Sequence, residues 1–100
     1  MQYSFIIPVY NRPDELDELL RSLAEQTYTA DFEVVVIEDG STISSESICQ
    51  QYQSSLSITY LAKPNTGPGD SRNYGMRRAK YDYFLILDSD CLLPRHYLEA

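Results

Sequence analysis

The sequence predicts an α/β fold, with a mainly parallel sheet and helices on both of its faces. Four short apolar runs, at residues 3–10, 32–39, 56–61 and 83–90, are separated by segments that carry helical signals. Strands that alternate with helices are typical of β-α-β units, whose right-handed crossovers place helices over the sheet. The composition, 43% hydrophobic and 23% charged, is that of an ordinary globular protein, and 100 residues suffice for a single core.

The first strand and the first helix have the clearest patterns. YSFIIPVY is a short apolar run of the kind that is buried on both faces of a parallel sheet, and we expect it to end at Pro8, which cannot donate to a ladder. From Pro13 onward, leucines at positions 16, 19, 20 and 23 repeat with the spacing of an amphipathic helix. Asp14 and Glu15 favour the first turn of this helix through its dipole.

The second strand and the second helix follow in order. FEVVVIED is rich in β-branched residues, which predicts a buried strand that ends at Glu38 and Asp39, and GST closes it with turn chemistry. SSESICQQYQ places Ile48 and Tyr52 four positions apart after several capping hydroxyls. That pattern indicates a short helix.

The last elements complete the alternation. LSITYL alternates apolar and polar residues, which predicts a strand near an edge of the sheet. We expect the next helix to begin at about Asp70 and to carry a stripe of small residues, Ser71, Gly75 and Ala79, that lets its backbone approach the sheet closely. YFLILDSD is predicted to be a fourth buried strand, and it stops in acidic residues.

Charge and cysteine content narrow the classes of protein. A formal net charge of -7 disfavours binding to nucleic acid, whose phosphates it would repel. Cys49 and Cys91 stand singly, so they predict neither a zinc site nor a disulfide framework, and they fit a reducing cytosol. Without a signal-peptide pattern or a long apolar run, we expect a cytoplasmic protein, with any membrane association through segments outside these residues.

Polar side chains follow three of the four predicted strands. In a parallel sheet the carboxyl ends of the strands share one edge, where ligands bind. Because hard oxygen ligands suit Mg²⁺ or Mn²⁺, the acids of LILDSD are candidate metal ligands. A lone DxD also forms turns or caps helices, so both interpretations stay open. The residues at the strand exits are Tyr10, Asn11, Glu38, Asp39, Asp88 and Asp90.

Three further residues allow two interpretations each. Asp39 is either a turn residue or an ionised acceptor for the donors of a nucleotide base. Tyr10 either packs in the core or offers a platform for a stacked base. Arg72 is either a solvated helix residue or, early in a helix after a Gly-rich turn, a ligand of a phosphate or a base.

Four segments resemble the large family 2 of glycosyltransferases, almost from end to end of the chain. They are IIPVYNRPDELDELLRSLAEQ, VVVIEDGST, PNTGPGDSRNYGMRRAK and YFLILDSD, and their order and spacing are more specific than any one motif. The resemblance implies a Rossmann-like GT-A fold and a donor that is a nucleoside-diphosphate sugar, with a uridine diphosphate sugar the commonest choice. It also implies an inverting transfer that needs a divalent metal, Mn²⁺ or Mg²⁺.

The resemblance also implies a role for particular residues. The PVYN segment begins the nucleotide pocket, and the aspartate before GS contacts the base. The arginine of SRN approaches the base or the diphosphate, the first DxD aspartate lies near ribose and metal, and the second binds the metal. Matched onto this sequence, the substrate-binding residues are Pro8, Tyr10, Asp39, Arg72 and Asp88, and the metal ligands are Asp88 and Asp90.

The family's catalytic base and acceptor site lie beyond the DxD motif. We therefore assign no catalytic residue here, and we expect residues 1–100 to form the N-terminal, donor-binding part of a longer domain. Such a part is expected to bind nucleotide without transferring sugar, and to self-associate through the uncovered edge of the DxD strand. The acceptor, whether glycan, lipid or protein, is not determined by these residues.

Two other functions remain as alternatives. A non-catalytic module that binds nucleotide sugars or a partner protein would keep the same fold without turnover, and it would lack an acid placed to deprotonate an acceptor. A phosphatase of the haloacid dehalogenase type also uses an apolar strand that ends in DxD. That family places the motif after its first strand, whereas here it closes the fourth and is followed by Cys91.

Overall fold

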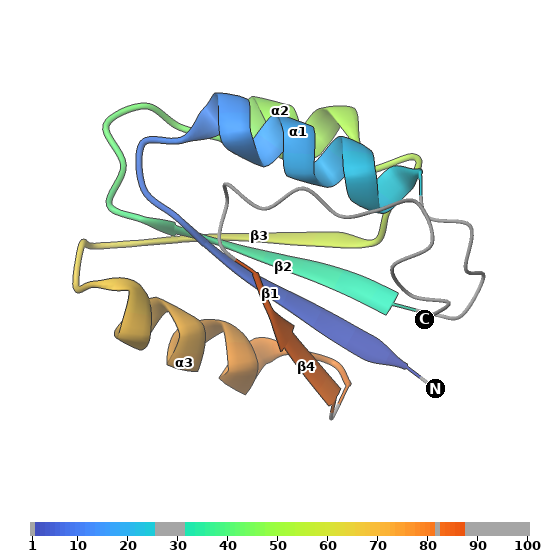
Figure 1. The fold of residues 1–100 in the computed structure, drawn as a ribbon. Coiled ribbons are helices and arrows are strands. Elements are labelled where there is room, and N and C mark those ends of the chain that lie inside the picture. Colours follow the sequence, from blue (N-terminus) through green and yellow to red (C-terminus); the bar gives the residue numbers. More distant parts are fainter. Residues whose placement is uncertain (1, 26–31, 82, 88–100) are drawn as a thin grey trace.

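The structure is a computed structural model that describes residues 2–25, 32–81 and 83–87 (Figure 1). Strands and helices alternate along these residues, as the sequence predicts. In order they are β1 (Tyr3–Val9), α1 (Pro13–Ala24), β2 (Phe32–Asp39), α2 (Glu46–Gln51), β3 (Ile58–Lys63), α3 (Pro68–Arg78) and β4 (Tyr83–Ile86).

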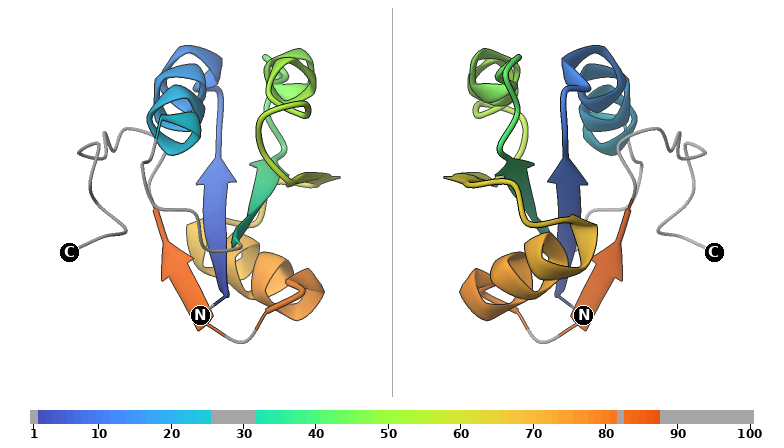
Figure 2. Two further views of the ribbon diagram at one scale, coloured as in Figure 1. Left: turned by 90° about the vertical axis from the view of Figure 1, so that its right-hand side faces the viewer. Right: turned by 90° about the vertical axis from the view of Figure 1, so that its left-hand side faces the viewer.

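The described strands form one parallel sheet in the order β3-β2-β1-β4. Helices α1 and α2 cover one face, and α3 covers the other (Figure 2). This arrangement confirms the predicted fold class and places β3 at an edge. The chain moves outward from β1 to β3 and then returns to pair β4 with the other side of β1, so the order reverses between β1 and β4. Ligands of parallel α/β sheets bind at such a reversal, beyond the carboxyl ends of the strands.

Alternation along the two central strands divides the core between the two faces. Phe5 and Ile7 of β1 point toward the leucines of α1, in a cluster that also holds Val34 and Val36 of β2. The intervening residues, such as Ile6, face α3 in a smaller cluster. Because successive side chains of a strand point to opposite faces, residues 38 and 39 at the end of β2 must also diverge.

The boundaries of several elements differ from the prediction; β3, expected over residues 56–61, covers Ile58–Lys63. Strand β1 continues past Pro8 to Val9. Leu87 N donates to Ile6 O, so the backbone of Pro8, two residues further along, also faces the side of β4. Among the described residues the register of β1 with β4 runs only to Ile6 and Ile86, so Pro8 interrupts no hydrogen bond of this pairing. Helix α3 begins at Pro68, two residues before the predicted start. Proline is favoured in a first turn because the N–H that it lacks would have no intrahelical partner there.

Strand β4 is more exposed than predicted. Tyr83 is 58% exposed, Phe84 39% and Ile86 40%, although the apolar run predicts a buried strand. In the described part of the chain β4 pairs with β1 alone, and α3 packs on β1 and β2. Self-association through this edge stays a prediction. Within the same residues, no helix is both long and apolar enough to cross a membrane.

Ser71 and Gly75 of α3 face the sheet, as predicted, whereas Ala79 lies just after the end of the helix. Ser71 is fully buried, and Ala79 packs against the cluster that contains Ile6 and Ile37. A Cβ atom on Gly75 would lie 2.5 Å from Ile37 Cδ1 and 3.0 Å from Ile6 Cγ2. Only a residue without a Cβ fits this approach without displacing the core.

Gly75→Ala is therefore expected to destabilise the protein. Overpacking a filled core costs about 1–3 kcal/mol, and this exceeds the gain in helix propensity, about 1 kcal/mol. Urea unfolding followed by circular dichroism measures the difference in free energy. Gly69→Ala, the same change in the same helix, is the matched control: an added Cβ there meets no atom of another described element within 4 Å, so stability should stay equal or rise. Equal losses in both variants would refute the close-packing argument.

Candidate functional site

The loops that follow β1 and β2 are joined by the side chain of Asn11. Its Oδ1 accepts hydrogen bonds from the backbone N–H groups of Thr42 (2.8 Å) and Ile43 (3.0 Å), and the backbone N–H of Asn11 donates to Ser41 Oγ (2.8 Å). Asn11 has φ = 52°, a left-handed conformation that asparagine tolerates better than most residues. The sequence placed Asn11 at a strand exit but gave it no role; the structure shows that it holds two loops of the edge together.

Gly40 makes the turn that follows Asp39 possible. Its φ is 69°, and a Cβ atom at this position would lie 2.6 Å from the backbone N of Asn65. The segment before α3 therefore passes directly against this turn. Asn65 Nδ2 donates to Asp39 O at 3.1 Å, which fixes the contact.

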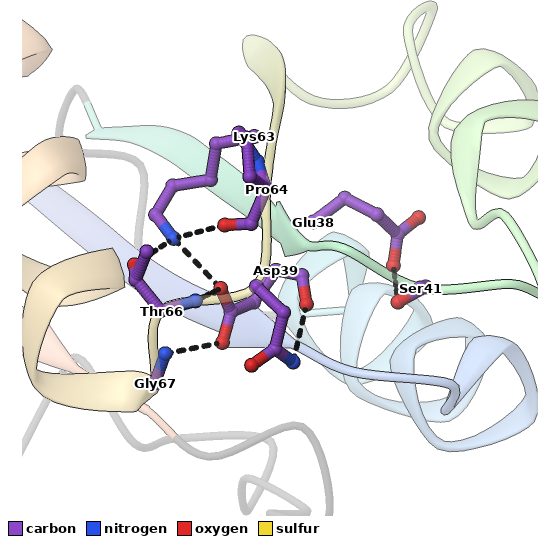
Figure 3. A network of polar contacts seen from close by, with 8 residues as sticks. Glu38, Asp39, Ser41, Lys63, Pro64, Thr66 and Gly67 are labelled. Atoms are coloured by element: carbon purple, nitrogen blue, oxygen red, sulfur yellow. Dashed lines mark hydrogen bonds and ion pairs between the residues drawn. The ribbon is translucent and has the colours of Figure 1, made fainter.

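Glu38 and Asp39 point to opposite faces of the sheet (Figure 3). Glu38 turns toward α2, where its carboxylate accepts hydrogen bonds from Ser41 Oγ (2.6 Å), Ser45 N (2.5 Å) and Tyr60 OH (3.0 Å). Burial raises the pKa of Tyr60, and the nearby Glu38 carboxylate raises it further, while a hydrogen bond with Ser44 lowers it. The net pKa is above the ordinary value, so the phenol keeps its proton and donates to Glu38. Glu38 thus organises the loop after β2.

Asp39 turns toward α3 and is 96% buried. Its Oδ1 accepts from Lys63 Nζ at 2.7 Å and from Thr66 N at 3.0 Å, and its Oδ2 accepts from Gly67 N at 3.0 Å. Burial alone would raise the pKa of Asp39, but the hydrogen bonds from Lys63, Thr66 and Gly67 outweigh it and hold the pKa below its ordinary value. The carboxylate is therefore ionised at neutral pH and accepts hydrogen bonds only.

Lys63 is the partner that the sequence interpretation missed. It lies directly beside Asp39 in the pairing of β2 with β3, and Figure 3 shows its ammonium reaching Asp39, Pro64 and Thr66. The signal was weak in the sequence, because LSITYL marks the strand only to residue 61. Extending the strand by two residues, in register with β2, would have brought the two charges together.

The other predicted residues of the nucleotide pocket lie at or near the same edge. Tyr10 follows β1 and is 52% exposed, which excludes core packing and leaves the ring available as a platform. Pro8 is half-buried near the end of β1, and Arg72 is exposed on α3. Asp88 and Asp90 lie outside the described residues.

An open hollow of about 550 Å³ adjoins these loops on the side of β3. Glu38, Ser41, Ser44, Tyr60 and Lys63 are among the residues that line it. The hollow lies on the face to which Glu38 points, with hydroxyls and the carboxylates of Glu38 and Glu46 on its walls, and Asp39 is not among the residues that line it.

Within residues 2–25, 32–81 and 83–87, no cluster of three or more His, Cys, Asp or Glu side chains is arranged to hold a metal ion. Glu38 and Asp39, the acids at the described edge, are both committed to protein donors. Burial raises the pKa of Cys49 to about 12, with Glu38 and Glu46 adding to the rise, so its thiol stays protonated and is no ligand or nucleophile at neutral pH.

Comparison with known proteins identifies the family. The sequence model described as Glycosyl transferase family 2 matches residues 4–100. The poly(ribitol-phosphate) beta-N-acetylglucosaminyltransferase TarS of Staphylococcus aureus (strain Mu50) is 35% identical over 99% of this chain, which spans 18% of that protein. Chondroitin synthase of Escherichia coli is 40% identical over 87% of this chain, which spans 13% of that protein.

Solved structures agree with the sequence comparison. The crystal structure of S. aureus TarS 1-349 superposes with a TM-score of 0.91 at 35% identity, over 99% of this chain and 30% of that one. The mannosyltransferase PcManGT of Pyrobaculum calidifontis, solved with GDP-Man and Mn²⁺, superposes with a TM-score of 0.85 at 29% identity, over 93% of this chain and 29% of that one. These likenesses confirm the expected GT-A fold. The chain belongs to glycosyl transferase family 2.

Proposed function

We propose that this protein transfers a sugar from a uridine diphosphate sugar to an acceptor, with a divalent metal and with inversion at the transferred carbon. The observation that carries the proposal is the buried Asp39 carboxylate, which Lys63 Nζ and the backbone N–H groups of Thr66 and Gly67 hold at the edge of the sheet where Tyr10 is exposed. S. aureus TarS, which superposes over 99% of this chain, has been solved with UDP and with UDP-GlcNAc.

The roles of the described residues follow from their chemistry. An acceptor-only carboxylate suits the N3–H group of uracil, whereas cytosine presents a lone pair at the same position. We propose that Asp39 binds this group and that Tyr10, with Pro8 beside it in β1, supports the face of the ring. Arg72, exposed on α3, would then pair with the diphosphate through its guanidinium fork.

Two predicted strand-exit acids, Asp88 and Asp90, are left as candidate ligands for a divalent metal. Because Glu38 and Asp39 are held by protein donors, the carboxylates that we propose as metal ligands are Asp88 and Asp90, with Asp88 also near the ribose. Hard carboxylate oxygens suit Mn²⁺ or Mg²⁺. A bound metal would neutralise the charge that develops on the departing diphosphate. The neighbour PcManGT has been solved with Mn²⁺ and GDP-Man, which supports metal use in this family.

The acceptor and the catalytic base are expected from other parts of the protein. The chain spans less than a fifth of the curated relatives reported above, so residues elsewhere have room to supply both. TarS is named for poly(ribitol-phosphate) and for a β linkage, which is the product that inversion of an α-linked donor gives. We propose a glycan acceptor for this protein on that basis.

Isothermal titration calorimetry tests the donor and the metal together. We expect UDP with Mn²⁺ to bind at least about tenfold (about 1.4 kcal/mol) more tightly than UDP with excess chelator, since a metal held by Asp88 and Asp90 would neutralise charge on the diphosphate. CDP with Mn²⁺ is the matched control for the base and should bind more weakly than UDP. Equal affinity with and without metal would remove the metal from the proposal, and equal affinity for UDP and CDP would remove the role of Asp39.

A further inference from the structure

We infer that Lys63 is a positioning residue for the nucleotide base: its ammonium fixes the Asp39 carboxylate against the segment before α3 and thereby sets the preference for uracil over cytosine. The inference rests on the proposed function of the edge as a site for uridine nucleotides. It adds a residue that the family resemblance did not mark.

The ammonium of Lys63 is fully engaged. Its Nζ atom donates to Asp39 Oδ1 at 2.7 Å, to Pro64 O at 2.8 Å and to Thr66 Oγ1, three acceptors for three N–H groups (Figure 3). The side chains of Lys63 and Asp39 are only 8% and 6% exposed. A charge this deeply buried is costly unless all its donors are satisfied, so the geometry of the group is closely determined.

The hydrogen bonds that Asp39 accepts from described residues leave one lone pair of its carboxylate unused. A carboxylate offers about four lone-pair sites. Among the described residues, Lys63 and Thr66 use two on Oδ1, and Gly67 uses one on Oδ2. The remaining position on Oδ2 suits a single donor such as the N3–H of uracil. Rotation of the carboxylate would break all three protein hydrogen bonds, so its orientation is set before any ligand binds.

Lys63 is the charged side chain that contacts this carboxylate within the described residues. Glu38, its neighbour in the chain, points to the opposite face, and the first turns of α3 contribute Asp70 and Arg72, both exposed. At the end of β1, Tyr10 is exposed too. Replacing Lys63 by an uncharged residue removes the partner that opposes the cost of burying the Asp39 charge. Protonation of Asp39 then becomes easier, and a protonated carboxyl can donate to the lone pair of cytosine.

The experiment compares UDP and CDP binding to the protein and its variants by calorimetry. Lys63→Met should reduce the ratio of UDP to CDP affinity by about tenfold, the loss that corresponds to one charge-assisted hydrogen bond. Lys63→Arg, which keeps the positive charge, should retain most of the ratio. If Lys63→Met does not fold, Lys63→Gln, which keeps a donor without the charge, takes its place.

A second measurement reports on Asp39 directly. Titration of its carboxyl carbon by NMR should show a pKa below the ordinary aspartate value in the parent and a higher pKa after the loss of Lys63. A folded Lys63→Met protein with the parent's UDP to CDP ratio would overturn the inference, as would a parent Asp39 that titrates like a free aspartate. A parent that binds neither nucleotide would instead overturn the proposed donor site.

Discussion

Replacing Asp39 with Asn is expected to lower UDP affinity about 10- to 100-fold and to erase the preference for UDP over CDP. The substitution removes the charge from a hydrogen bond to the base, and charged hydrogen bonds contribute about 1.5–3 kcal/mol. It also turns an acceptor-only group into one with two N–H donors, which suit the lone pair of cytosine rather than the N3–H of uracil. Calorimetry with both nucleotides in the presence of Mn²⁺ measures the change.

Glu38→Gln is the matched control for this prediction. It removes one negative charge at the preceding position, from a carboxylate that faces α2. That carboxylate accepts hydrogen bonds from Ser41, Ser45 and Tyr60. Its ratio of UDP to CDP affinity should stay that of the parent. A control that loses the preference as far as Asp39→Asn does would show that the net charge of the edge, rather than the group at position 39, selects the base.

The Asp39 carboxylate also links stability to pH. Because its pKa is lower in the folded protein than in the unfolded chain, its contribution to stability is complete above the unfolded value. That contribution disappears as the pH falls through the folded value. In Asp39→Asn this part of the acid dependence should be missing, which unfolding curves recorded over the acid range would reveal.

Replacing Asp90 with Asn should cost the protein about a thousandfold in sugar transfer, because loss of metal stabilisation at a departing diphosphate amounts to several kcal/mol. The neutral amide keeps the shape of the side chain, so the fold should be intact. A radiolabelled-donor assay with added Mn²⁺ measures transfer, and circular dichroism reports on the fold.

Glu18→Gln serves as the control, since it removes one negative charge from an exposed position on α1. It should leave transfer unchanged. Full activity in Asp90→Asn at saturating and at limiting Mn²⁺ would mean that the metal, if used, is held by other groups.

The sequence predicts the order of elements well because hydrophobic spacing records burial directly. The leucines of α1 and the β-branched run of β2 each identify their element. The exposure of β4 was not predictable in this way. The segment YFLILD is apolar enough to predict a strand, but its composition does not say which residues pack on that strand. Hydrophobicity marks what a segment favours, and tertiary contacts decide what covers it.

The site was partly predictable for a related reason. Motif spacing placed Tyr10, Asp39 and Arg72 at or near one edge, and the structure puts them there, while the roles assigned to them remain to be tested. The hydrogen bonds of Asn11 and the ion pair of Lys63 with Asp39 depend on strand register and on a left-handed residue. Local composition predicts neither the register nor the left-handed conformation, so these contacts are seen only in the folded structure.

The divergence of Glu38 and Asp39 at the end of β2 makes this strand sensitive to length as well as to composition. A deletion of one residue between Phe32 and Ile37 would exchange the faces of every side chain on one side of the gap, because the period of a strand is two. If the residues after the gap are the ones that shift, the carboxylate of Glu38 would take the place of Ile37 on the face of α3, and that of Asp39 would take the place of Glu38 beside Tyr60. Among natural variants of this chain, substitutions along β2 should therefore be far commoner than insertions or deletions within it, whatever sugar or acceptor each variant uses.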